Sequence, residues 1–174
     1  MTGVLLVGGA SRRFGSPKAL ARVDGETLAE RGHRVLSEAF DRVIAVGKAA
    51  DGLALPFPVL DDGAEARAAM VGVAAGLRLA GTDVAVMLPT DMPYVTPRLL
   101  TDLADAARGV DAAVVSRGPL PGAYRRSALP LLEARIATGD FALHRALAGL
   151  ATRTVGAPEA ELRNVNQPGD LEKG

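Results

Sequence analysis

The chain has 174 residues, and its 20 lysines and arginines balance 20 aspartates and glutamates, so the formal net charge is zero. With no cysteine, a thiolate nucleophile, a cysteine-ligated metal centre and a disulfide framework are excluded. Electroneutrality, no tryptophan and only two tyrosines and four phenylalanines argue against a nucleic-acid groove, because such a groove needs excess positive charge and aromatic platforms for stacking bases.

The length predicts a single domain over residues 1–174, with a core large enough to need no disulfide or structural metal. The first apolar run, residues 4–7, is far shorter than a signal-peptide core or a membrane span of about 20 residues. We therefore expect a cytoplasmic protein that binds neither membrane nor nucleic acid and whose partners are small molecules or other proteins.

Strand and helix signals alternate through the first two thirds of the chain. Short apolar runs predict buried strands, and apolar stripes at helical spacing predict the helices between them. The predicted strands are residues 4–7, 42–46, 56–60, 84–88 and 112–115, and the predicted helices are residues 26–40, 64–80 and 97–108. This alternation predicts a three-layer α/β fold, in which ligands bind beyond the carboxyl ends of the strands.

The last third of the chain is less regular. Residues 119–124 predict an irregular loop or an edge strand, because prolines interrupt them. Residues 129–137 and 141–150 predict two short helices, residues 152–155 a late strand and residues 168–173 a terminal helical turn.

The turn after the first strand has the composition of a phosphate-binding loop. Gly8 and Gly9 let backbone N–H groups approach an anion, and Ser11, Arg13 and Lys18 add donors and positive charge. The spacing matches neither a Walker A loop nor the dinucleotide-binding glycine pattern. The alternative is an ordinary flexible loop with solvated arginines.

The turn after residues 84–88 carries Asp91, a position from which one carboxylate can hold Mg²⁺ against phosphate oxygens. The alternative is that Asp91 caps a turn or the following helix. Asp62 follows another strand and can accept a hydrogen bond from a base or a sugar, or simply be solvated. Asn164 and Asn166 suit hydrogen bonds to a ligand or an Asx turn.

Other polar residues give no catalytic constellation. His33 and His144 each lack a second histidine or a carboxylate at ligand spacing, so we expect neither to hold a metal. Ser11 has no nearby base, which argues against a hydrolase.

In these segments the chain resembles the nucleotidyltransferases that join a nucleoside triphosphate to a phosphorylated acceptor, and among them the molybdenum cofactor guanylyltransferases. The opening pattern Leu-Ala-Gly-Gly-x-Ser-x-Arg-Met-Gly-x-Asp-Lys is matched by Leu6, Gly8, Gly9, Ser11, Arg13, Gly15 and Lys18. Asp91-Met92-Pro93 matches the Asp-x-Pro metal motif. Residues 164–171 resemble the ending Asn-x-Asn-Thr-Pro-Glu-Asp-Leu, and residues 120–126 resemble the substrate-side segment with Pro and Tyr.

The chain departs from the family pattern at three places. Pro17 replaces the aspartate before the lysine, and residues 68–72 only partly match the Gly-Pro-Leu-x-Gly segment. After the second strand, where the family often has Asn, the chain has Val46-Gly47-Lys48.

The resemblance implies a Rossmann-like α/β/α nucleotidyltransferase fold with a mostly parallel sheet. It implies Mg²⁺-dependent transfer of GMP from GTP to a molybdopterin-type phosphorylated acceptor, with release of pyrophosphate. The implied catalytic residues are Lys18, Arg13 and Asp91, with Asp91 as the metal ligand. The implied nucleotide-binding residues are Leu6, Val7, Gly8, Gly9, Ser11, Gly15, Lys18, Asp62 and Asp91, and the implied acceptor-binding residues are Tyr124, Asn164 and Asn166. Transient contacts with proteins of cofactor biosynthesis or molybdoenzyme maturation would fit this role.

Three alternatives remain open from the sequence. The first is a cytidylyltransferase for the same cofactor, and the second a nucleotidyltransferase for a phospholactate or a sugar phosphate. The third is a nucleotide-binding regulator without turnover, which the departures at Pro17 and at Ala68-Ala69 leave open.

Overall fold

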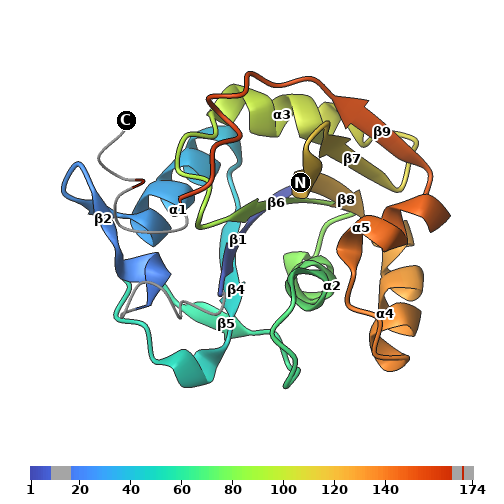
Figure 1. Cartoon of the computed structure of the whole chain (residues 1–174), viewed down its shortest axis with the longest axis horizontal. Helices are drawn as coiled ribbons and strands as arrows, with labels where there is room; N and C mark the ends of the chain where they lie inside the picture. The colour runs from blue at the N-terminus through green and yellow to red at the C-terminus, as the bar shows by residue number, and fades with distance from the viewer. Residues whose placement is uncertain (9–16, 166–169, 171–174) are drawn as a thin grey trace.

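A mostly parallel sheet forms the centre of the molecule (Figure 1). The structure is a computed structural model that describes residues 1–8, 17–165 and 170. Within these residues, seven strands form one sheet in the order β5-β4-β1-β6-β8-β7-β9. The strands are β1 (Thr2–Val7), β4 (Val43–Gly47), β5 (Val59–Asp61), β6 (Val84–Pro89), β7 (Ala112–Val115), β8 (Gly118–Arg125) and β9 (Thr152–Val155). All neighbouring pairs are parallel except those that β8 makes with β6 and β7.

Helices cover both faces of this sheet, which confirms the three-layer α/β architecture (Figure 1). On one face lie α1 (Leu28–Ala39) and α3 (Pro97–Ala106), and on the other lie α2 (Ala69–Ala80), α4 (Leu129–Ala137) and α5 (Leu143–Ala146). The side chains of β1 alternate between the two layers, since Leu5 packs with α1 and α3 whereas Leu6 packs with α2. Both faces of β1 are therefore core, as its continuous apolar run predicts.

Short elements complete the described chain. A two-stranded ribbon pairs β2 (Arg22–Val23) with β3 (Glu26–Thr27). Four 3₁₀ turns are η1 (Lys18–Leu20), η2 (Ala49–Asp51), η3 (Arg126–Ala128) and η4 (Leu147–Gly149). No helix of the described residues combines the length and the apolar character that a membrane crossing requires.

Helix starts follow local capping chemistry. Thr27 caps α1 in a capping box, in which its hydroxyl accepts from the Glu30 amide and the Glu30 carboxylate accepts from the Thr27 amide. Thr96 caps α3, and Pro97 occupies its first turn. Both starts were predicted from the sequence.

The prediction of a loop or edge strand at residues 119–124 is wrong. β8 lies inside the sheet, antiparallel to β6 on one side and to β7 on the other. Residues 122–125 make the pairs with β6, so Pro119 and Pro121 precede the stretch that needs a donor on that side. The prolines therefore do not interrupt the β6–β8 ladder.

Several boundaries also differ from prediction. The helix predicted at residues 64–80 begins only at Ala69, and residues 64–68 before it form neither helix nor strand. The third strand is residues 59–61 in place of 56–60, and the helix predicted at 141–150 is α5 followed by η4. Of the terminal turn predicted at 168–173, only residue 170 lies within the described residues.

Candidate active site

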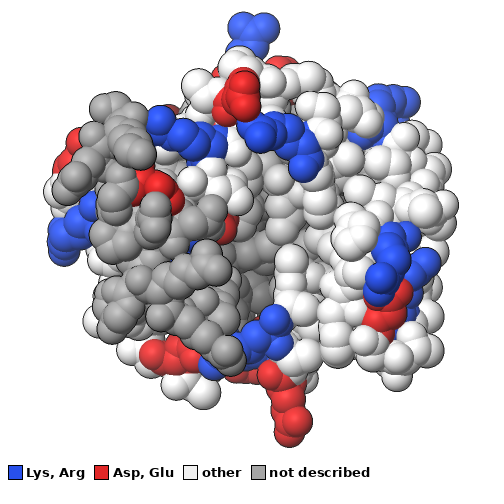
Figure 2. Space-filling model, viewed as in Figure 1, with Lys and Arg blue, Asp and Glu red and all other residues white. Residues whose placement is uncertain are grey.

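A pocket of about 1070 Å³ opens at the carboxyl ends of the parallel strands. β5, β4, β1 and β6 are neighbours in the sheet and end at the same edge, at Asp61, Gly47, Val7 and Pro89. Figure 2 shows a hollow near the centre of one face of the molecule, with basic side chains on its upper and lower rims. Parallel topology therefore brings together turns that are far apart in the sequence. The Thr90 amide, for example, donates to the carbonyl oxygen of Leu6, 84 residues earlier, at 3.3 Å.

Seven of the residues singled out from the sequence line this pocket. They are Leu6, Val7, Gly8, Lys18, Asp62, Asp91 and Asn164. Gly9, Ser11, Arg13, Gly15 and Asn166 lie outside the described residues. The two turns expected to carry the chemistry, after β1 and after β6, thus border one cavity.

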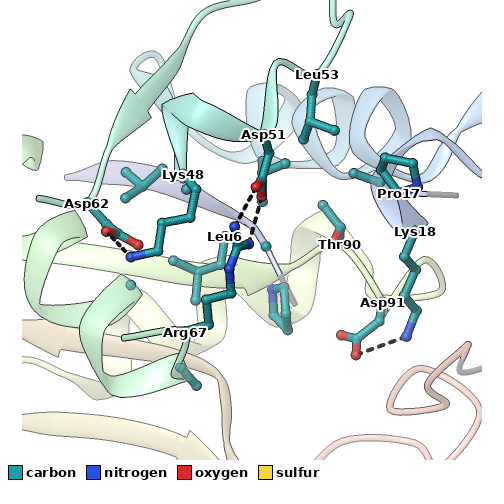
Figure 3. Close-up of a pocket in the computed structure, with 18 of the residues that line it drawn as sticks. Leu6, Pro17, Lys18, Lys48, Asp51, Leu53, Asp62, Arg67, Thr90 and Asp91 are labelled. Atoms are coloured by element: carbon teal, nitrogen blue, oxygen red, sulfur yellow. Dashed lines mark hydrogen bonds and ion pairs between the residues drawn. The ribbon is translucent and has the colours of Figure 1, made fainter. Parts of the chain in front are cut away.

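Lys18 and Asp91 face each other on one side of the pocket (Figure 3). The Lys18 ammonium donates to Asp91 Oδ2 at 3.3 Å, and the two side chains are 18% and 29% exposed. The Asp91 carbonyl oxygen also accepts from the Val165 amide at 2.8 Å, which fixes the segment with Asn164 to this turn. A cation and a carboxylate with access to solvent are therefore held at the end of β6.

The Asp91 carboxylate has the chemistry that a Mg²⁺ ion needs. Mg²⁺ is usually held by one or two carboxylates and completes its shell with water and substrate phosphate oxygens. The described residues contain no group of three or more His, Cys, Asp or Glu side chains that could cage a metal on their own. One exposed carboxylate beside a cationic side chain thus fits a metal shared with a phosphorylated substrate.

The opposite side of the pocket contains a second ion pair that the sequence reasoning missed. The Lys48 ammonium donates to Asp62 Oδ1 at 2.7 Å and also to the Ala64 carbonyl oxygen. The Lys48 and Asp62 side chains are 10% and 8% exposed, so this pair is nearly buried. The signal that could have found Lys48 is its place directly after β4, at the same edge as Asp62 after β5.

Close packing shapes this end of the pocket. A Cβ atom at Gly47 would lie 2.0 Å from the Val7 carbonyl oxygen, so only glycine fits between β1 and the start of the Lys48 turn. Ala68 and Ala69, at the start of α2, contribute only small side chains to the lining. Together these residues leave space beside Lys48 and Asp62.

Two acidic side chains fix the position of η2 at the outer wall of the pocket, near Lys48 and Asp62. Asp61 accepts from the amides of Ala49 and Gly63, and these backbone hydrogen bonds lower the pKa of its carboxyl group. Asp51 accepts two hydrogen bonds from Arg67 at 2.6 and 2.9 Å, which lowers the Asp51 pKa and raises the Arg67 pKa (Figure 3). Both contacts hold η2 against the edge of the pocket.

Tyr124, predicted to face the acceptor, does not reach the site. Its ring is fully buried between the sheet and the α2–α4 layer, and its hydroxyl donates to the Pro119 carbonyl at 2.6 Å. Burial raises the pKa of this hydroxyl. The prediction is wrong because residues 119–124 are an interior strand, whose alternate side chains enter the core.

A second hollow of about 630 Å³ adjoins the first and shares Met92, Leu120 and Asn164 with it. Arg117 and Arg163 border this hollow. Arg117 pairs with Glu159 at 2.7 Å, and the Arg163 guanidinium lies 4.3 Å from the centre of the Tyr94 ring. Asn164 thus lies where two cavities meet, one of them bordered by arginines.

Comparisons with known proteins agree with this geometry. The model of the MobA-like NTP transferase domain matches residues 3–155. A probable molybdenum cofactor guanylyltransferase of Chloroflexus aggregans is 34% identical over 98% of this chain and 91% of its own length. A protein of the same name from Opitutus terrae is also 34% identical, over 99% of this chain and 94% of its own length.

Solved structures share the fold. Molybdopterin-guanine dinucleotide biosynthesis protein A from Archaeoglobus fulgidus is 26% identical, with a TM-score of 0.85 over 99% of this chain and 96% of that chain. The 2-C-methyl-D-erythritol 4-phosphate cytidylyltransferase of Thermus thermophilus is 21% identical, with a TM-score of 0.74 over 98% of this chain and 95% of that chain. Because the second likeness extends to an enzyme for another nucleotide, the fold by itself does not choose the base.

Proposed function

The chain belongs to the MobA-like NTP transferase family and is a nucleotidyltransferase, and from that premise we propose that it transfers GMP from GTP to molybdopterin and releases pyrophosphate. The observation that carries the proposal is the pocket at the strand ends, where Lys18 and Asp91 meet. The names of the relatives from Chloroflexus aggregans and Opitutus terrae support GTP and the molybdenum cofactor as substrates.

The reaction needs positioning and charge neutralisation more than covalent help from the protein. An oxygen of the acceptor phosphate attacks the α-phosphorus of GTP, and the bond from that phosphorus to the β-phosphate oxygen breaks. Lys18 and Arg13 stabilise the negative charge of the triphosphate, while backbone N–H groups at Gly8 and Gly9 bind its oxygens. Ser11 and Gly15 are assigned to the nucleotide by the resemblance alone. Asp91 would hold Mg²⁺, which, when bound, supplies positive charge to the α-phosphate and the leaving pyrophosphate.

Charge orients the nucleotide in the pocket. The triphosphate lies at the Lys18 end, where the cation and its partner are open to solvent, and the nucleoside extends over Leu6 and Val7 toward Asp62. The Asp62 end is suited to an uncharged base because its own charges are already paired.

We assign the acceptor to the side of Asn164, and the same role for Asn166 rests on the resemblance alone, because Asn166 lies outside the described residues. Asn164 supports this assignment because it borders both hollows, and the second hollow offers two arginines to an anionic acceptor. Tyr124 has no part in it, since its side chain is fully buried.

The test is a product assay with GTP, CTP, ATP and UTP, each with molybdopterin and Mg²⁺. We expect pyrophosphate release with GTP, and a product whose mass equals molybdopterin plus GMP. Turnover with CTP would indicate a cytidylyltransferase, and turnover only with a phospholactate or a sugar phosphate would indicate another acceptor. GTP binding without pyrophosphate release under any of these conditions would indicate a regulator.

A further inference from the structure

Lys48 has one hydrogen-bonding position that its contacts with the described residues do not use. Its ammonium carries three N–H groups. Of the contacts within the described residues, one donates to Asp62 Oδ1 and another to the Ala64 carbonyl oxygen. Lys48 also lines the pocket (Figure 3), so a third N–H can reach a ligand atom there.

Asp62 is oriented in the same way. Oδ1 accepts from Lys48 at 2.7 Å and from the Ala64 amide at 3.1 Å, and these are its side-chain contacts with described residues. Oδ2 is then the oxygen that can accept from a ligand. The pair therefore presents a donor and an acceptor, held side by side at one end of the pocket.

The charges of this pair suit a neutral, polar group. The Lys48 charge is compensated by Asp62 at 2.7 Å in a nearly buried setting, so this end attracts a phosphate less than the Lys18 end does. A hydrogen bond from a buried ammonium to a carbonyl oxygen is nevertheless stronger than one between neutral groups. The edge of a nucleobase fits these demands.

We propose that Lys48 is a specificity-determining residue that donates to the O6 carbonyl of guanine while Asp62 accepts from the adjacent N–H groups of the base. This proposal rests on the proposed use of GTP. In the same pose adenine would place an amino group against the Lys48 ammonium, two donors facing each other, which disfavours ATP. Lys48 thus selects the base, whereas Lys18 acts on the phosphates.

The sharpest test replaces one ligand atom. In 6-thio-GTP sulfur, a weak acceptor, replaces only O6. Binding of GTP and of 6-thio-GTP to the full chain is measured by calorimetry, with Mg²⁺ present. Because a hydrogen bond to a charged group contributes about 1.5–3 kcal/mol, we expect GTP to bind at least about tenfold more tightly.

Variants then assign the effect to Lys48. In Lys48→Met the preference for GTP over 6-thio-GTP should disappear. The double variant Lys48→Met/Asp62→Asn, which leaves no unpaired buried charge, should lose it as well and guards against misfolding of the single variant. Arg34→Met is the control, since it removes a cation that is paired with Glu26 and Glu38 outside the pocket, and it should keep the preference.

The outcomes separate the two proposals. If the wild type binds GTP but does not distinguish it from 6-thio-GTP, or if both Lys48 variants keep the preference, another donor such as the backbone at the start of α2 reads O6 and the assignment of Lys48 is overturned. If the wild type binds CTP and not GTP, the proposed function and this inference both fail.

Discussion

The two ends of the pocket each contain a lysine–aspartate pair, but the pairs differ in distance and burial. Lys18 and Asp91 are 3.3 Å apart with side chains 18% and 29% exposed, whereas Lys48 and Asp62 are 2.7 Å apart and only 10% and 8% exposed. The first pair has access to solvent, so phosphate oxygens can replace Asp91 as the partner of Lys18, and a metal ion can replace Lys18 as the partner of Asp91. The second is closed and preorganised, as expected of a site that recognises a fixed shape.

The two ion pairs should also differ in how much each contributes to the stability of the fold. A partly exposed ion pair contributes about 1 kcal/mol or less to stability. Removing one member of a buried pair leaves an unpaired charge and costs about 3–5 kcal/mol. We therefore expect substitutions at the Lys18 end to reduce the rate with little loss of stability, and substitutions at the Lys48 end to reduce stability as well as binding.

Asp91→Ala should have the largest effect on the reaction. Without the carboxylate that we propose as the metal ligand, kcat/KM for GTP should fall by about 10³-fold or more, while the free energy of unfolding changes little. Steady-state pyrophosphate release measures the first and urea denaturation the second. Asp105→Ala, which removes an exposed carboxylate paired with Arg108 on α3, is the control. Unchanged turnover of Asp91→Ala with Mg²⁺ would refute the metal role.

Lys18→Ala should reduce kcat by about 10²–10³-fold, because a preorganised cation at the triphosphate is lost. Lys18→Arg should recover part of this rate, since the charge is kept while the geometry changes. Single-turnover kinetics separates this effect from weaker GTP binding. A rate constant equal to that of the wild type would mean that Lys18 has only a structural role.

Lys48→Met should instead lower the free energy of unfolding by about 3–5 kcal/mol, because the buried Asp62 carboxylate loses its partner. The double variant Lys48→Met/Asp62→Asn should recover most of this loss. Urea denaturation at neutral pH measures both. A single variant as stable as Lys18→Ala would show that the two ends do not differ in the way their burial indicates.

His33, which lies on α1 and does not line the pocket, should give the smallest effect. Its ring stacks on Phe57, with 4.2 Å between ring centres, and burial lowers the pKa of the imidazole below its ordinary 6.5. A lowered histidine pKa means that the unfolded chain takes up the proton first as pH falls. This contribution to stability is therefore complete above pH 6.5 and is lost as pH falls through the folded pKa.

The effect of His33 is measured as the change in the free energy of unfolding between pH 8 and pH 5.5, compared between the wild type and His33→Phe. The variant keeps a stacked ring and removes the titrating group, so its stability should fall less over this range. A pH dependence identical to that of the wild type would contradict the assignment to His33.

Local patterns were sufficient for much of the fold. Residues 84–88 were predicted as a strand close to its observed bounds, because an apolar run of this length has few other ways to be buried. The strand predicted at residues 152–155 has the observed bounds although most of its side chains are exposed; three of its four residues are β-branched, which favours a strand. The start of α3 was predictable because Thr96 and Pro97 act within one turn of helix. β8 was not, because whether a strand with prolines lies inside a sheet depends on which of its residues are paired.

The site shows the same division. The glycine turn, Lys18 and Asp91 were predicted as site residues because short patterns of adjacent residues after a strand indicate them. Lys48 was noted only as part of a departure from the family pattern, and its role was missed because its partner Asp62 is 14 residues away in the sequence. Tyr124 was assigned to the acceptor because burial cannot be read from a short proline-rich segment.

The sequence by itself determined the alternating strands and helices and the first turns of α1 and α3. It also singled out the turns after β1 and β6 as the candidates for the chemistry. Each of these features depends on residues within a few positions of one another. Only the tertiary structure decided that these turns border one pocket, that β8 lies inside the sheet with Tyr124 in the core, and that Lys48 is buried against Asp62. Those features arise from the order and direction of strands that are far apart in the chain. Hydrophobic periodicity predicts where strands occur but not which strands become neighbours.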